Sequence, residues 1–276
     1  MRSRTWTTAA IGFVYCGALF WAQRRRPLRP AVDPGARRLL RNGTVAAGAG
    51  LAVLIAERPV VSPLSDICER RRIGLTHSLP ASREAEKVWR DLLAVVLMDY
   101  TLYLWHVLMH RWAFLYRLHQ VHHADLDLDT TTALRFHLAE MLASVPWRAA
   151  QVLLIGTTPR ALRIWQLATL ASIAFHHSNI RLPRRLERIL GLIITTPRLH
   201  GIHHSMVRDE QDSNWSNGLS IWDFLHGTRR ESPSRPDIEI GVPRYRDRKQ
   251  VTLGQLLKMP RVPAWRARML RNGRAP

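Results

Sequence analysis

Histidines are the residues in this sequence with the clearest chemical potential. There are 13 of them, and all but His77 lie between His106 and His226. Most recur at helical spacing, in the motifs His106-x-x-x-His110, His119-x-x-His122-His123 and His200-x-x-His203-His204. Residues three and four positions apart share a helix face. We therefore expect the histidines of each motif to converge on one side of a helical turn.

This clustering favours a metal site. Neutral imidazole is a good ligand for iron, copper, nickel and zinc. One HxxxH pair would be weak evidence, but three motifs in about a hundred residues are hard to explain otherwise, because buried imidazoles without partners cost free energy. The eight motif histidines exceed the roughly four to six ligands that one ion accepts. The sequence therefore predicts two ions.

Other common metal-binding patterns are missing from the sequence. The two cysteines, Cys16 and Cys68, form no CxxC motif, so neither a disulfide framework nor a thiolate site is expected. Soluble di-iron bundles use glutamates with Glu-x-x-His pairs, and this chain has no such pair of motifs. The expected site is therefore built from histidines.

Apolar blocks that could form membrane helices alternate with arginine-rich stretches. Residues 6–22 carry no charge and are followed by three arginines, which favours an uncleaved anchor over a signal peptide. Residues 91–110 form a second span, because about 20 apolar residues cross a hydrocarbon core. Residues 45–56 are short for a span, and we interpret them as half of a hairpin or a re-entrant segment. Residues 62–90 are expected to be a loop or surface helix.

The second half of the chain predicts further helices. Residues 138–156 and 161–175 are apolar, and Pro159 between them predicts a tight helical hairpin. Residues 186–196 predict a shorter helix that ends at Pro197. No stretch of useful length alternates between apolar and polar residues, so the predicted fold class is all-α, an integral-membrane helical bundle.

The predicted elements divide the chain into three parts. Residues 1–44 form an N-terminal membrane anchor and basic linker. Residues 45–228 form a membrane-embedded domain with the histidine motifs. Residues 229–276 form a basic, peripheral tail on the cytosolic side.

The net charge of +20 suggests a negatively charged partner. Its arginines are clustered at the ends of apolar blocks, at residues 24–26, 37–41 and 70–72. Anionic lipid headgroups attract such clusters, whereas no nucleic-acid-binding module is visible. We therefore expect a membrane surface, and no nucleic acid, as the partner of this charge.

Six pieces of sequence between Asp99 and Thr228, close to half of the chain, occur in an informative order. They are Asp99 with YTLYLWHVLMH, then LYRLHQVHHAD, TTALRFHLAE, FHHSN, TPRLHGIHHS and DSNWSNGLSIWDFLHGT. Each piece alone is unspecific, but the combination is highly specific. In this order they resemble the fatty acid hydroxylase/sterol desaturase superfamily of membrane di-iron enzymes.

The resemblance implies a ligand set for two iron ions. It places ligands on the eight motif histidines: His106, His110, His119, His122, His123, His200, His203 and His204. His137 and His177 match further family positions, and His176 is a weaker candidate. The chain departs from the family at Asn214-Trp215-Ser216 and at His226-Gly227-Thr228. We therefore interpret His226 as structural, and the substrate subfamily stays open.

Three acidic residues are candidates for orienting these ligands. A metal-bound imidazole usually donates its other N–H to a carboxylate or carbonyl. We expect Asp99 near His106, Glu140 near His137 and Asp223 near the last motif. The competing interpretation is that Asp99 caps a polar helix face and Asp223 caps a turn.

The resemblance also implies an activity. The two irons would lie on the cytoplasmic side of the membrane and use O2 to hydroxylate or desaturate a lipid C–H bond, in a sterol, fatty acyl or carotenoid-like chain. No flavin, nicotinamide or CxxC motif is visible, so a separate reductase, ferredoxin or cytochrome is expected to supply electrons. The alternative is a membrane metal-binding protein or transporter without redox catalysis. Transport sites lie near the bilayer midplane, whereas these motifs lie at the ends of apolar blocks, which favours an enzyme.

Overall fold

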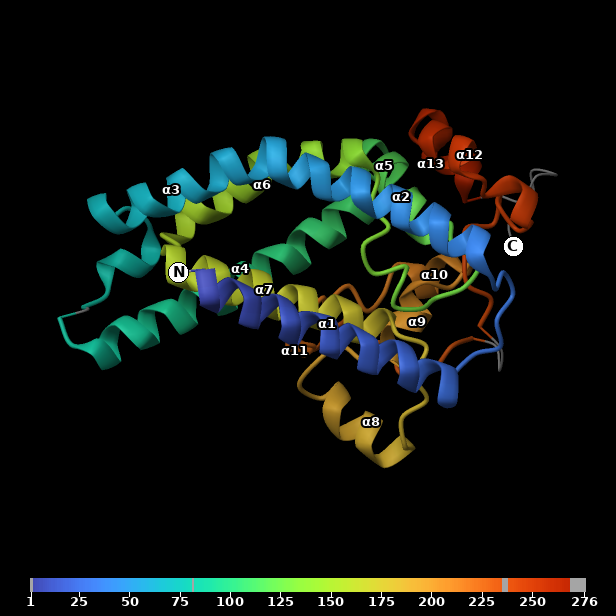
Figure 1. Cartoon of the computed structure of the whole chain (residues 1–276), viewed down its shortest axis with the longest axis horizontal. Helices are drawn as coiled ribbons and strands as arrows, with labels where there is room; N and C mark the ends of the chain where they lie inside the picture. The colour runs from blue at the N-terminus through green and yellow to red at the C-terminus, as the bar shows by residue number, and fades with distance from the viewer. Residues whose placement is uncertain (1, 81, 235–237, 269–276) are drawn as a thin grey trace.

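The computed structural model describes residues 2–80, 82–234 and 238–268, with side chains from residue 10 onward. In these ranges the chain is all-α, as predicted: helices make up the fold, and the only β pairings are isolated bridges. Figure 1 shows long helices running along the molecule, with short helices gathered towards one end. Predicted features of residues 1, 81, 235–237 and 269–276 lie outside the described part, as do the side chains of residues 2–9.

The first half of the bundle is built from α1 (Arg2–Arg25) and from a long helical run. That run consists of α2 (Ala36–Ala52), a π-helical turn η1 (Val53–Glu57) and α3 (Arg58–Arg71), followed by the short 3-10 helix η2 (Leu75–Ser78). The segment Ala36–Ser78 has 43 residues and is long and apolar enough to cross a membrane. α1 contains the predicted anchor, and Tyr15 at its exposed surface donates a hydrogen bond to Ala171 O. Membrane crossing by α1 stays a prediction.

Residues 45–56 were expected to be too short for a span, and this prediction is wrong. They lie in the middle of the continuous run from α2 to α3. The π-helical turn directly precedes Pro59, whose missing N–H and bulky ring disturb a regular α-helix. Glu57 does not end the helix, because it is buried with its carboxylate 3.9 Å from Arg148 Nε in the neighbouring helix. Residues 62–71 also belong to this helix.

The second half of the bundle contains the helices predicted for it. Residues 91–110 lie within α4 (Glu84–Arg111), and the predicted helical hairpin consists of α6 (Leu138–Ile155) and α7 (Pro159–His177). α4 and α6 are each long and apolar enough to cross a membrane. The turn between α6 and α7 uses Gly156 at a φ of 77°, where glycine has no Cβ penalty. Thr158 then caps α7 by accepting a hydrogen bond from Ala161 N.

Short helices surround one end of this bundle. They are α5 (Ala113–His123), α8 (Arg184–Gly191), α9 (Pro197–His203), α10 (Arg208–Gln211) and α11 (Ile221–Leu225). The helix predicted at residues 186–196 ends earlier than expected, at Gly191. Pro197 begins the next helix instead, in the first-turn position where its missing N–H costs nothing.

The C-terminal segment was expected to be a peripheral tail, but it packs against the rest of the protein. It contains η3 (Arg248–Gln250), α12 (Leu253–Lys258), η4 (Met259–Arg261) and α13 (Ala264–Ala267). Its apolar residues form one buried cluster with α5, in which Leu256 and Met259 lie near Tyr116 and Val121. Basic residues dominate its composition, but sparse apolar residues are enough to cover α5. The predicted boundaries at residues 44 and 228 stay predictions.

A buried ionic network ties α2 to the loop that follows α5. Asp125 is fully buried, and its carboxylate accepts hydrogen bonds from Arg38 Nε at 3.0 Å and Nη2 at 2.8 Å. Arg135 Nη1 lies 2.8 Å from the same carboxylate. Burial alone would raise the pKa of Asp125, but Arg135 and Arg38 hold that pKa well below its usual range. The network fixes the chain directly after His122 and His123.

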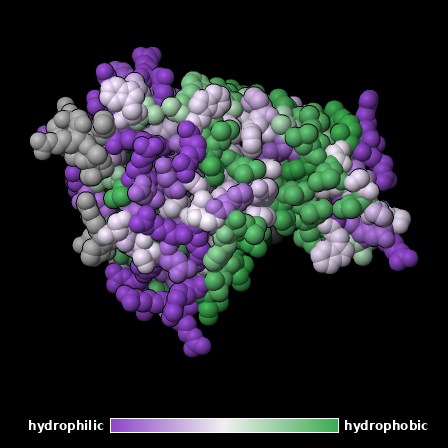
Figure 2. All heavy atoms as spheres, turned by 180° about the vertical axis from the view of Figure 1, so that it is seen from behind, coloured by the Kyte–Doolittle hydropathy of each residue, from purple (hydrophilic) through white to green (hydrophobic). Residues whose placement is uncertain are grey.

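The surface divides into two halves. Figure 2 shows a broad hydrophobic area over one half of the molecule, bounded at its far end by hydrophilic residues, and a mainly hydrophilic surface over the other half. The hydrophobic half belongs to the long helices, and the hydrophilic half to the end with the short helices. This distribution matches a bundle that sits in a bilayer and carries a water-exposed cap.

Candidate metal centre

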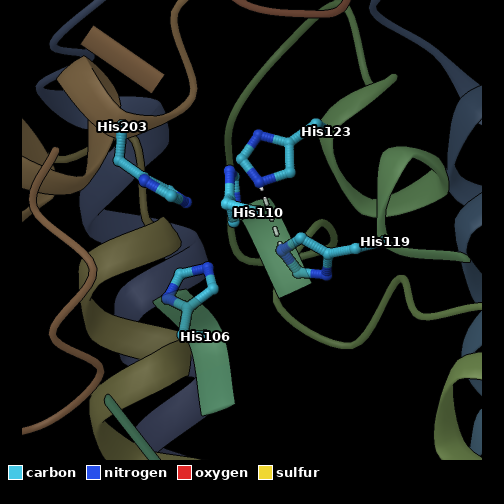
Figure 3. Close-up of side chains that lie close together, drawn as sticks. All are labelled: His106, His110, His119, His123 and His203. Carbon is cyan, nitrogen blue, oxygen red and sulfur yellow. Dashed lines mark hydrogen bonds between the residues drawn. The ribbon is translucent and has the colours of Figure 1, made fainter. Parts of the chain in front are cut away.

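Nine histidines meet at the capped end of the bundle in two clusters. We call them the five-histidine cluster (His106, His110, His119, His123, His203) and the four-histidine cluster (His122, His177, His200, His204). In each cluster, one ring nitrogen from every histidine lies within 4.8 Å of all the others. All nine side chains are buried, with at most 3% of any residue exposed. Figure 3 shows the five-histidine cluster with its imidazoles pointing towards a common centre.

Each HxxHH motif divides its histidines between the two clusters. His119 and His123 belong to the five-histidine cluster, whereas His122 belongs to the other. The motif on α9 is divided in the opposite sense, with His200 and His204 in one cluster and His203 in the other. The expected convergence of all three histidines of a motif is therefore wrong. Positions i+3 and i+4 are about 100° apart around a helix, so the side chains of two adjacent histidines point in different directions and join different clusters.

Four helix ends bring the clusters together. His106 and His110 come from the last turns of α4, and His177 is the last residue of α7. α5 ends at His123, and α9 ends at His203 with His204 as its C-cap. Thr196 starts α9 by accepting a hydrogen bond from Leu199 N. The clustered histidines therefore lie at the ends of two long helices, α4 and α7, and of two short ones, α5 and α9.

Three histidines of the five-histidine cluster have an outer nitrogen that is hydrogen-bonded to the surrounding protein, whereas His123 Nδ1 has no partner among the described residues. His106 Nδ1 donates to Trp215 O at 2.7 Å, and His203 Nδ1 donates to Ser213 O at 2.9 Å. His119 Nδ1 lies 2.9 Å from Glu140 Oε1. A carbonyl can only accept, so the Nδ1 atoms of His106 and His203 carry their protons and the Nε2 atoms present lone pairs. His110 has no hydrogen-bond partner in the described structure at either ring nitrogen.

In the four-histidine cluster the inner nitrogens form a close chain. His122 Nε2 lies 3.0 Å from His177 Nε2, and His200 Nε2 lies 3.1 Å from both His177 Nε2 and His204 Nε2. His177 Nδ1 donates to Ile173 O at 2.7 Å, so its Nε2 also presents a lone pair. The Nδ1 atoms of His122, His200 and His204 have no partner among the described residues.

These nitrogens fit metal ions. Nitrogens that share an ion at roughly 2.1 Å are about 3 to 3.5 Å apart, which matches the spacing of the Nε2 atoms. Burial lowers the pKa of His203 and of His177 to about 3 each. Both imidazoles are therefore neutral near pH 7, which is the form that binds metals. Converging neutral lone pairs inside a buried core are costly without a cation between them.

The three acidic candidates all lie near the clusters, but in different roles from those expected. Glu140 orients His119 and not His137. Asp223 accepts hydrogen bonds from Trp215 N and Ser216 N, each at 3.0 Å. Asp99, like Asp223, contacts no histidine in the described structure.

Asp99 and Asp223 act on one loop. Asp99 accepts hydrogen bonds from Trp222 Nε1 at 2.7 Å and from Leu219 N at 3.0 Å. Gly218 packs so closely on Asp99 that any Cβ at this position would collide with the carboxylate. The two aspartates thus fix residues 215–222, and this loop presents the Trp215 carbonyl to His106.

Four other histidines lie outside both clusters. His137 is half-buried and caps α6, with its Nδ1 accepting a hydrogen bond from Ala139 N at 3.0 Å. Its family-based assignment as a ligand is therefore not supported by its position. His176 is buried with its ring 4.1 Å from that of His200, but it is not part of either cluster. His77 lies at the distant end of α6, near Gly156, and His226 stacks on Tyr103.

Two contacts at the site were missed by the sequence analysis. Phe136 stacks on His122, with ring centroids 4.5 Å apart and planes 13° apart. The Arg29 guanidinium lies against Gly201, where any Cβ would collide with it. Gly201, between His200 and His203, was a visible signal for a close approach, but nothing in the sequence identified Arg29 as the neighbour.

Comparisons with known proteins agree with this site. Residues 92–228 match the fatty acid hydroxylase family. The chain is 33% identical over 152 residues to ornithine lipid hydroxylase OlsE of Rhizobium tropici, covering 55% of this chain and 45% of that protein. It is 29% identical over 140 residues to alkylglycerol monooxygenase of Homo sapiens, covering 51% of this chain and 30% of that protein. It is 28% identical over 147 residues to a cholesterol 25-hydroxylase-like protein of Danio rerio, covering 51% of this chain and 55% of that protein. No solved structure matches the chain.

The match is confined to the part of the chain that holds the site. The aligned region spans about half or less of the length of these curated relatives. The matched residues 92–228 contain all nine histidines of the two clusters, together with Asp99, Glu140 and Asp223. The chain belongs to the fatty acid hydroxylase/sterol desaturase superfamily.

Proposed function

We propose that this protein is an O2-dependent oxidoreductase that hydroxylates a C–H bond of a membrane lipid, with two iron ions held by the nine clustered histidines. The observation that carries the proposal is the pair of adjoining clusters of buried imidazoles. Nine converging neutral ligands exceed the capacity of one ion. The clusters lie where the hydrophobic half of the molecule meets its hydrophilic cap, a place that a lipid chain could reach from the bilayer.

The chain's own residues hold and orient the ligands. Glu140 and the carbonyls of Trp215, Ser213 and Ile173 accept the Nδ1 protons of four histidines, which directs the Nε2 atoms inward. The surrounding helices exclude water, since all nine imidazoles are buried. Iron bound there would supply the reduction of O2 and the oxidation of the substrate, chemistry that no amino-acid side chain provides.

Hydroxylation is favoured over desaturation by the relatives, which are named as hydroxylases and a monooxygenase. In hydroxylation, one oxygen atom enters the C–H bond to form an alcohol, and the other leaves as water after taking up two electrons and two protons. Desaturation would instead remove two hydrogen atoms from the lipid, with both oxygen atoms leaving as water. Relatives named for an ornithine lipid and for an alkylglycerol direct attention to polar membrane lipids as substrates, with sterol and carotenoid-like chains as further classes.

The electrons must come from a separate donor, because the sequence contains no flavin, nicotinamide or iron–sulfur motif. We place the capped end in the cytoplasm, where a reductase, ferredoxin or cytochrome would be available. The net charge of +20 suits an acidic carrier protein.

The test is a reconstitution in lipid nanodiscs. The purified protein is loaded with ferrous iron and supplied with a chemical reductant, isotopically labelled O2 and total membrane lipid, and the products are analysed by mass spectrometry. We expect a lipid that carries one labelled oxygen atom, formed only with both reductant and O2. His203→Ala protein provides the control. A product that lacks two hydrogens and carries no label would establish desaturation. Metal binding with no change in any lipid under these conditions would favour a metal-binding or transport role and contradict the proposal.

A further inference from the structure

α8 and α11 expose apolar side chains on the outside of the cap. Seven large apolar residues in this region are each at least 44% exposed: Leu186, Ile189, Leu192, Ile193, Ile221, Phe224 and Leu225. Hydrogen bonds from Ser220 Oγ and Arg229 Nη1 to Gly191 O join the two helices. We call the unit of residues 181–193 and 221–225 the α8–α11 foot. A cluster of this kind on a water-exposed surface would be unfavourable, so it indicates a partner.

The foot has three distinct faces. Leu186 and Ile189 lie on one face of α8, Arg184 and Arg188 lie on another, and Arg185 lies at the border between the two, following the angular order of a helix. The third face carries Glu187, which is buried and turned towards the protein. Its carboxylate accepts hydrogen bonds from Arg198 N and Nε, each at 3.1 Å, at the start of α9. The foot is therefore attached to the helix that carries His200, His203 and His204.

The charge of the foot selects between possible partners. Arg181, Arg184, Arg185 and Arg188 are exposed, and the only acidic residues of the foot, Glu187 and Asp223, are buried. A second copy of this chain would bring the same arginines against them and would be repelled. Anionic lipid headgroups would instead attract them.

The position of the foot supports the same partner. α8 forms the lowest lobe of the molecule in Figure 1. In Figure 2 this lobe is hydrophilic on one side and hydrophobic on the side towards the broad hydrophobic area of the long helices. An amphipathic helix with a basic polar face and a leucine/isoleucine face lies in the plane of a membrane surface.

We infer that the α8–α11 foot is an interfacial anchor. Its apolar face enters the headgroup boundary of the bilayer, and its arginines bind anionic lipid. This inference adds a lipid contact beyond the spanning helices and does not depend on the reaction at the histidines. It requires only that the bundle resides in a membrane.

The test measures the depth of the foot in nanodiscs. Single cysteines replace Ile189 or Arg184 in a Cys16→Ser background, in which the remaining Cys68 is buried, and each carries a spin label. Collision rates are measured with O2, which partitions into lipid, and with a water-soluble nickel chelate. We expect the label at 189 to collide with O2 and be shielded from the chelate, and the label at 184 to show the opposite. Equal access of the chelate to both would place the foot in water. Shielding of both labels from O2 and from the chelate would show a protein partner. Either result overturns the inference.

The lipid preference has its own measurement. Adding phosphatidylglycerol to phosphatidylcholine nanodiscs should increase the shielding of the label at 189 from the chelate. The double substitution R184E/R188E should remove this increase, whereas R261E/R266E, with the same charge change on the C-terminal segment, should retain it. An increase that survives R184E/R188E would show that the arginines of the foot do not select anionic lipid.

Discussion

The two histidine clusters are held in different ways. In the five-histidine cluster, three imidazoles donate outward to fixed acceptors: Glu140 Oε1, Trp215 O and Ser213 O. In the four-histidine cluster only His177 has such an acceptor, and His122, His200 and His204 are held by packing, including the Phe136 ring on His122. A polar shell fixes the tautomer and direction of a ligand, whereas packing fixes only its position. The five-histidine cluster should therefore be the better pre-organised site.

Removing one ligand from either cluster should have the largest effect. His122→Ala removes a ligand from the four-histidine cluster, and His203→Ala removes one from the five-histidine cluster. Each substitution should abolish lipid oxidation, because both ions act on one reaction. The loss of activity should exceed the roughly 10–100-fold decrease expected for changes outside the ligand set. Activity assays and membrane insertion are measured together. His226→Ala, which changes a histidine outside the clusters, should keep most activity. If His122→Ala or His203→Ala protein retained substantial turnover, the assignment of that residue as a ligand would fail.

Glu140→Gln should separate the two clusters. It keeps the size of the side chain but weakens the hydrogen bond from His119 Nδ1, so the metal affinity of the five-histidine cluster should fall roughly 10–100-fold. Titration of the apo-protein with metal would then show one weakened and one unchanged site. Glu239→Gln is the matched control, because Glu239 is an exposed carboxylate paired with Arg246. It should change the metal affinity of neither cluster. Equal weakening of both sites would contradict the idea that the polar shell serves one cluster.

Arg38→Gln should reduce stability more than catalysis. Removing one partner from a buried ion pair costs about 3–5 kcal/mol, and Asp125 would keep only part of its hydrogen bonding. We expect a lower Tm by tryptophan fluorescence, with activity per folded molecule close to that of the parent protein. Arg246→Gln, which breaks an exposed pair, should leave Tm nearly unchanged. An unchanged Tm for Arg38→Gln would show that the network does not hold the loop after His123.

His137→Gln should have the smallest effect of these changes. His137 caps α6 and contacts neither cluster, so the substitution should cost at most about 1 kcal/mol of stability. Metal content and turnover should match those of the parent protein. Loss of one ion in this variant would restore His137 to the ligand set that the family resemblance implied.

Local features of this protein could be predicted from the sequence where they depend on composition and spacing. The positions of α4, α6 and α7 follow from their mainly apolar stretches, and the hairpin at Pro159 follows from its turn residues. Eight of the nine clustered histidines were visible as helical motifs, and His177 entered through the family resemblance. Both kinds of signal survive folding because a helix face and a chain break are local properties.

The errors concern contacts between distant parts of the chain. Spacing alone could not show that His122 and His123 belong to different clusters, because this depends on where α4, α7 and α9 approach α5. Glu140 was matched with the nearby His137, whereas the fold brings it to His119. Residues 45–56 were expected to be too short for a span because the charged Glu57 follows them, but the structure buries Glu57 beside Arg148 within a continuous helical run. In each case a tertiary partner determined the outcome.

Counting the metal ions tests the central claim most directly. The protein is purified without chelators, loaded anaerobically with ferrous iron and freed of excess metal, and iron and protein are measured on the same sample by elemental and amino-acid analysis. Two adjoining imidazole clusters predict two ions per chain, falling to about one in His204→Ala protein as the four-histidine cluster loses its ion. A ratio of one or below in the fully loaded parent protein would contradict the account, because one ion leaves half of these buried nitrogens without a partner.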